Sequence, residues 1–203
     1  MKIKIEDWYD LHKGFELELH PGVTCLVGPN GAGKTTLLTQ LKEYAKANDI
    51  PMWQYSNFAD GPHEDYWYLE TGKTEMFATA AFSSEGEKVA LHFAGRVGKM
   101  GNAIQKASVE GKPIFVFLDA LDSGASIDRA RDVLELFETI DSDIRSGTEA
   151  YILCAVNQYE LTKPPVRCVD CRTGKEVSFK NYEDYAEFIC TYFEKHKRRK
   201  EVR

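Results

Sequence analysis

The segment GPNGAGKTTLL, residues 28–38, constrains this chain more than any other because it contains the pattern G-x-x-x-x-G-K-[ST]. Glycines permit backbone conformations closed to other residues, so successive N–H groups can turn toward phosphate oxygens. The apolar run VTCLVG precedes the loop, and residues 34–47 follow it with leucines at helical spacing. The loop therefore joins a buried strand to a helix whose positive N-terminus faces the same place. This segment predicts a phosphate cradle.

The pattern assigns roles within the cradle. Lys34 is expected to reach the β and γ phosphates of a nucleotide, and the Thr35 hydroxyl to bind Mg²⁺. The other nucleotide contacts are assigned to the loop and the first helical turn, namely Asn30, Gly31, Ala32, Gly33 and Thr36. The predicted cofactors are ATP and Mg²⁺.

A second motif follows about 85 residues later, in FVFLDALDSG. Asp119 ends the apolar run FVFL, and an aspartate at the end of a buried strand can hold the metal through water. The alternative for Asp119 is a carboxylate that caps a turn. The next residue is Ala120, whose side chain has no group that can activate water.

Strand-like and helical segments alternate along the chain, which predicts an α/β domain with a mainly parallel sheet and a ligand at the carboxyl ends of its strands. With 203 residues, of which 43% are hydrophobic, we expect a single domain. Residues 1–24 are predicted to form antiparallel strands, and residues 165–203 a hairpin and a closing helix. Further helices are expected at 34–47, 74–81, 85–109 and 127–145.

Charge and composition exclude several classes of protein. A net charge of −6 argues against a protein that coats DNA by itself. The tail KHKRRKEVR is either a local basic patch or a solvated helix end. No apolar run approaches the roughly 20 residues that span a bilayer, so we expect a soluble, cytoplasmic protein without a membrane partner.

Five cysteines, an odd number, with two of them in apolar strand-like runs, argue against a secreted disulfide framework. Cys168 and Cys171 form a C-x-x-C for which structural, metal-binding and redox roles all stay open.

Taken together, these motifs resemble an ABC-type ATPase head domain, a P-loop NTPase, of the SMC and RecF-like branch that serves DNA maintenance and repair. GPNGAGKTTLL is a close match to the phosphate loop of that family. SSEGEKVAL resembles its signature L-S-G-G-[QE], with Ser84 and Gly86 at matching positions and Glu85 replacing the first glycine. LDALDSGASID aligns with L-D-E-P-x-S-G-L-[SD]. The resemblance covers roughly residues 3–160.

The resemblance implies a homodimer with two nucleotides buried between two subunits. Ser84 and Gly86 would contact the γ-phosphate held by the partner, a role compatible with Ser84 as a helix N-cap. Asn57, or alternatively Gln54, would occupy the position that senses Mg²⁺. An aromatic residue at position 8 or 9 would stack on adenine or else pack against the protein. The interval between the loop and the signature is too short for a coiled coil or a transporter's helical subdomain.

Two positions depart from the family. Ala120 replaces the glutamate that polarises water, and Asn157 stands where a switch histidine is expected. Asp122 and Glu160 are carboxylates that could substitute for the glutamate, although Asp122 has the alternative role of a polar residue at the dimer face. We expect tight ATP binding, ATP-dependent dimerisation and slow hydrolysis.

A DNA, nuclease or repair partner follows from the resemblance only. The alternatives are a non-hydrolysing ATP-sensing module, a transporter ATPase subunit and a P-loop kinase.

Overall fold

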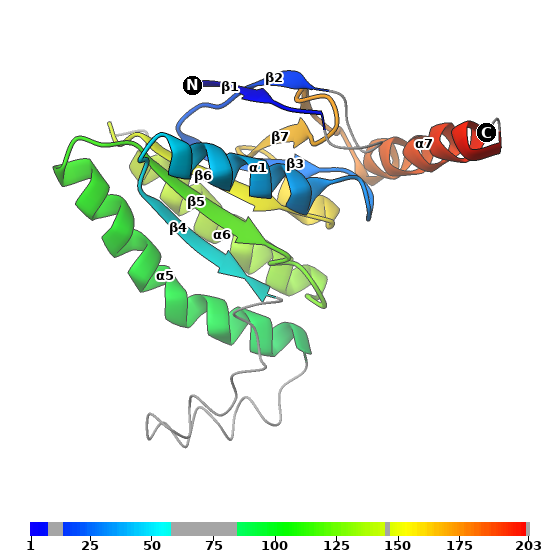
Figure 1. Ribbon diagram of the computed structural model, residues 1–203. Coiled ribbons are helices and arrows are strands. Elements are labelled where there is room, and N and C mark those ends of the chain that lie inside the picture. The colour runs from blue at the N-terminus through cyan, green and yellow to red at the C-terminus, as the bar shows by residue number, and fades with distance from the viewer. Residues whose placement is uncertain (8–13, 58–84, 145–146, 202–203) are drawn as a thin grey trace.

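The computed structural model describes residues 1–7, 14–57, 85–144 and 147–201 (Figure 1). Its centre is a six-stranded sheet in which five neighbouring strands are parallel and the last strand is antiparallel to its neighbour. The order across the sheet is β4 (Met52–Ser56), β5 (Ile114–Asp119), β6 (Ala150–Ala155), β3 (Gly22–Val27), β7 (Arg167–Asp170) and β8 (Glu176–Val177). The predicted mainly parallel sheet is confirmed.

A separate antiparallel pair forms at the N-terminus, as predicted, from β1 (Lys2–Ile5) and β2 (Phe15–Glu18). Their apolar side chains alternate with charged ones, so Ile3, Ile5 and Leu17 are buried while the charged residues face solvent. The pair lies over the same face of the central sheet as α1 (Lys34–Ala47), with which it shares one core cluster (Figure 1).

The opposite face is covered by α5 (Glu85–Val109) and α6 (Ile127–Ile144). Strands β3, β5 and β6 are buried at every residue because helices cover both of their faces. The chain closes with a 3-10 helix (Tyr159–Thr162) and α7 (Tyr182–Glu201). The predicted helices near 34–47, 85–109 and 127–145, the C-terminal hairpin and the closing helix are thus present, whereas the segment 74–81 lies outside the described residues.

The topology brings several chain segments to one edge of the sheet. Because β3, β4, β5 and β6 are parallel, the segments that follow them all begin at their carboxyl ends. Helix α5 precedes β5, and a short connection joins its end to the start of that strand. The helix therefore runs antiparallel to β5 and begins near the edge at which the strands end (Figure 1). None of the described helices is long and apolar enough to cross a membrane.

Candidate nucleotide-binding site

The phosphate loop runs from the end of β3 to the start of α1, as the motif predicts. Gly31 has φ 79° and Gly33 has φ 96°, the left-handed region that glycine enters without a steric cost. Gly33 caps α1 with no side-chain hydrogen bond, so the first-turn N–H groups are left for a ligand. The backbone N–H of Ala32 donates to the Pro29 carbonyl at 3.0 Å, which closes the loop.

The side chain of Lys34 lies within this loop. Its ammonium donates to the carbonyl oxygens of Gly28 at 2.6 Å and Pro29 at 3.2 Å, and the residue is 8% exposed. Burial lowers the pKa of Lys34 from its ordinary value, while neighbouring Cys171, Asp122 and Asp119 oppose that effect. A cation held among carbonyls beside the helix N-terminus suits a polyphosphate anion.

Two of the three predicted magnesium ligands, Thr35 and Asp119, lie close together at the carboxyl edge of the sheet. Thr35 Oγ1 lies 3.2 Å from Asp119 Oδ1. Asn57 follows Ser56, the residue of β4 paired with Asp119, and its buried Oδ1 has no hydrogen-bond partner among the described residues. A hydroxyl and a carboxylate that leave room for phosphate oxygens are the donor set that Mg²⁺ prefers, so these residues fit the ion.

A cavity of about 600 Å³ opens over the loop. Most of the site residues predicted from the sequence line this cavity: Asn30, Gly31, Gly33, Lys34, Thr35, Thr36, Asp119 and Asn157. Three further residues, Ala120, Ser123 and Ala155, complete the lining among the described residues. Of the other predicted residues, Ala32 is a buried residue of the loop, and neither Ala32 nor Asn57 lines the cavity.

Of the two predicted trans contacts, Gly86 lies in the first turn of α5. Ser84 lies outside the described residues, as do residues 8 and 9. Gln54, the alternative to Asn57, is exposed along β4.

Ala120 stands in the cavity wall with φ 56°, a left-handed conformation that costs a non-glycine residue about 1 kcal/mol. The turn that imposes it is closed by a hydrogen bond from the Ser123 N–H to the Ala120 carbonyl. Among the described residues that line the cavity, Asp119 carries the only carboxylate. Residue 120, which stands in the wall beside Thr35 and Asp119, therefore has no group that can accept a proton from water.

Asp122 has different contacts from those of a water-activating residue. It is 4% exposed and is not among the lining residues. Its Oδ2 accepts from the backbone N–H groups of Asn157 at 2.5 Å and Gln158 at 2.8 Å. Its Oδ1 accepts from Asn157 Nδ2 at 3.4 Å. The carboxylate thus binds the loop after β6, which favours a positioning role over proton transfer.

The same loop is held from the other side by Tyr185 of α7. The Tyr185 hydroxyl donates to the Asn157 carbonyl at 2.5 Å, and its ring packs edge-on against Phe179, with centroids 5.2 Å apart. Sequence reasoning missed Tyr185, because a tyrosine on the apolar side of an amphipathic helix looks like an ordinary core residue. Glu160, the other candidate carboxylate, forms an ion pair with Lys163 at 3.6 Å and does not line the cavity.

Comparison with protein families finds a match at residues 2–88 to a family described as an AAA domain. The matched range contains the phosphate loop and the start of α5, but it is less than half of the chain. Together with the parallel sheet, it identifies a P-loop NTPase fold and supports an ATP-binding domain of the ATPase type. No curated protein matches the chain.

Proposed function

We propose that this protein is an ATP-binding switch of the ABC ATPase type, which dimerises around Mg²⁺-ATP and hydrolyses it slowly. The proposal treats residues 1–203 as one ATP-binding domain. One observation carries it: Lys34, Thr35 and Asp119 line a cavity in whose wall Ala120 directly follows Asp119.

The binding half of the site supports tight ATP binding. Lys34, the free amides at the start of α1 and the helix dipole all favour a polyphosphate anion. Mg²⁺ held near Thr35 and Asp119 would neutralise charge on the phosphates. Each of these groups binds ATP without taking a proton from water.

The hydrolytic half supports a slow reaction. Loss of a general base commonly costs about 10²–10⁴ in rate. Asn157 lines the cavity and can donate a hydrogen bond, but an amide cannot carry a proton as a histidine does. Positioning and electrostatic stabilisation remain, and these supply much of the catalysis of phosphoryl transfer. We therefore expect a low rate of hydrolysis.

Dimerisation is supported by the signature-like segment at the start of α5. Gly86 lies in the first turn of that helix. In the proposed dimer, Ser84 and Gly86 of each subunit contact the γ-phosphate held by the other, through the positive N-terminus of α5. A nucleotide held between two subunits links ATP binding to assembly.

The resemblance to DNA-maintenance ATPases favours a DNA, nuclease or repair partner. A net charge of −6 makes a protein partner, or a local basic patch, more consistent with this role than a wholly basic surface. The second candidate function is an ATP sensor that does not hydrolyse its ligand at all, which the Ala120 and Asn157 positions favour. A single-turnover assay with radiolabelled ATP separates these two functions, because only the first releases phosphate.

Size-exclusion chromatography with light scattering tests the dimer. We expect a monomer without nucleotide and a dimer with Mg²⁺-ATP. Lys34→Ala should remove both ATP binding and dimerisation, whereas Lys46→Ala, an exposed lysine in the last turn of the same helix, should leave both intact. A monomer under both conditions, with ATP binding demonstrated by calorimetry, would disprove the dimer and leave the ATP site standing.

A further inference from the structure

The two cysteines of the C-x-x-C lie on opposite faces of the sheet. Cys168 belongs to the core shared with α5 and α6, and Cys171 to the core shared with α1. Side chains alternate along a strand, so a spacing of three places them on opposite sides. The Cys168 thiol donates to the Thr162 carbonyl and the Cys171 thiol to the Ala32 carbonyl, each at 3.5 Å. The pair therefore forms neither a shared metal site nor a disulfide.

Cys171 lies directly beside the phosphate loop. Strands β3 and β7 pair with Val27 opposite Asp170, and the Cys171 N–H then donates to the Val27 carbonyl at 3.1 Å. This ladder places Cys171 next to Gly28. A Cβ added at Gly28 would lie only 2.9 Å from Cys171 Sγ. One thiol thus contacts both Gly28 and Ala32, which begin and nearly end the loop.

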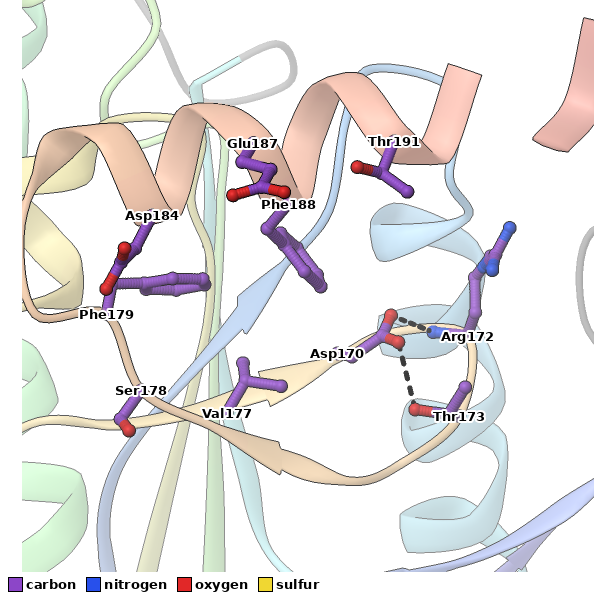
Figure 2. A pocket seen from close by; sticks show the side chains of 10 residues that line it. All are labelled: Asp170, Arg172, Thr173, Val177, Ser178, Phe179, Asp184, Glu187, Phe188 and Thr191. Carbon is purple, nitrogen blue, oxygen red and sulfur yellow. Dashed lines mark hydrogen bonds between the residues drawn. The ribbon is translucent and has the colours of Figure 1, made fainter. Parts of the chain in front are cut away.

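A tight turn fixes the position of Cys171. The Asp170 carboxylate, which is 9% exposed, accepts from the Arg172 N–H at 3.0 Å and from Thr173 Oγ1 at 2.9 Å, as Figure 2 shows. The Asp170 carbonyl also accepts from the N–H groups of Thr173 and Gly174. Figure 2 shows Asp170 at a second cavity, between the hairpin and α7, which Cys171 does not line. The turn therefore holds the thiol against the phosphate loop.

We infer that Cys171 is a positioning residue for ATP binding, whose sulfur sets the spacing between Gly28 and Ala32. The size of the sulfur matters because protein interiors are close-packed and relax only partly when an atom is lost. A smaller side chain leaves a gap under the loop, and a larger one displaces Gly28. Either change moves the amides and carbonyls that surround Lys34. The inference rests on the proposed ATP binding, and on neither dimerisation nor hydrolysis.

Cys168 offers a matched control. Both cysteines are buried and both donate a thiol hydrogen bond of 3.5 Å to a backbone carbonyl, but only Cys171 contacts the loop. We expect Cys171→Ala and Cys168→Ala to lower the melting temperature by similar amounts. In calorimetry with Mg²⁺-ATP, Kd should rise about fivefold for Cys171→Ala, as for the loss of one hydrogen bond and its packing contact, and stay within twofold for Cys168→Ala.

The outcomes separate this inference from the proposed function. An unchanged Kd in Cys171→Ala, or an equal rise in both variants, would overturn the positioning role while leaving ATP binding intact. Absence of ATP binding by the unmodified protein would overturn both. If Cys171→Ala does not fold, Cys171→Ser and Cys168→Ser make the same comparison, with a hydroxyl donor in place of the thiol.

A double-mutant cycle tests the direct contact with Gly28. Gly28→Ala should weaken ATP binding more than tenfold, because the new Cβ meets the sulfur and because φ there is +150°. Adding Cys171→Ala removes the sulfur, so the double variant should bind more tightly than the two single losses predict. Strictly additive losses would contradict a contact between these residues.

Discussion

The carboxylate of Asp122 accepts a 2.5 Å hydrogen bond from the backbone N–H of Asn157, 35 residues further along the chain. This bond ties the loop after β5 to the loop after β6, and both loops line the nucleotide cavity. A residue that arranges the cavity and a residue that activates water respond differently to substitution.

Asp122→Asn tests which of the two roles holds. The amide keeps an oxygen acceptor for the Asn157 N–H but loses the charge, so we expect the free energy of unfolding to fall by about 1–2 kcal/mol. Single-turnover hydrolysis should stay within about fivefold of the unmodified protein and keep its pH profile. A 100-fold fall in rate, with ATP binding and stability unchanged, would instead assign Asp122 as the proton acceptor.

Ala120→Glu should accelerate hydrolysis. It places a carboxylate in the cavity wall beside Asp119, and a positioned general base contributes about 10²–10⁴ in rate, so a gain of at least tenfold is expected. Ala120→Gln is the matched control, because it has the same size and no group that accepts a proton at neutral pH. Equal rates in the two variants would mean that the wall position does not reach the attacking water.

Thr35→Val should remove the contribution of Mg²⁺ to ATP binding. Valine keeps the shape of threonine and lacks the hydroxyl that lies 3.2 Å from Asp119 Oδ1. We expect a loss of about tenfold in ATP affinity with Mg²⁺ and no change in EDTA, where the metal is absent from both proteins. A loss of the same size in both buffers would point to a general effect on the loop.

Asn57→Leu should stabilise the protein and weaken its binding of Mg²⁺-ATP. The buried Oδ1 of Asn57 has no hydrogen-bond partner among the described residues, and burying an unsatisfied amide costs about 1–3 kcal/mol. A leucine, which has the same branched shape, removes that cost together with the oxygen that the family resemblance assigns to sensing Mg²⁺. A lower melting temperature in this variant would show that the amide supports the fold instead.

Stability should fall between pH 9 and about pH 12. Burial, and then the charge of Glu176, raises the pKa of Cys168 to about 12 from an ordinary value of 9.0, and burial raises that of Cys171 to about 12. Below pH 9 both thiols are protonated in the folded and unfolded chains. Above it the unfolded chain releases these protons first, so the free energy of unfolding decreases.

Urea unfolding from pH 8 to pH 11 measures this loss. The variant Cys168→Ala should lose less stability over the range than the unmodified protein, whereas Cys190→Ala, which removes an exposed thiol, should match it. Identical curves for all three proteins would contradict the assigned shift.

Local patterns predicted the fold and the phosphate loop from the sequence. The phosphate loop in residues 28–38 forms through the conformations of a few neighbouring residues. Its glycines and Lys34 are therefore enough to predict a phosphate-binding loop where a strand precedes it and a helix follows. Apolar runs identified β3, β5 and β6 because each of these strands is buried on both faces. The loop and these strands can be predicted from local sequence without knowing which segments pack against them.

The tertiary structure decided everything that depends on contacts between distant segments. Asp122 was a candidate for activating water only because it lies two residues after Ala120. Its carboxylate instead accepts hydrogen bonds from Asn157 and Gln158, in the loop after β6. The contact of Tyr185 with Asn157 likewise depends on where α7 packs. The C-x-x-C left structural, metal-binding and redox roles open, and strand alternation with the register of β7 against β3 places one thiol in each core. The sequence by itself determined a cradle for phosphate, and the order of the strands determined which side chains hold that cradle in shape.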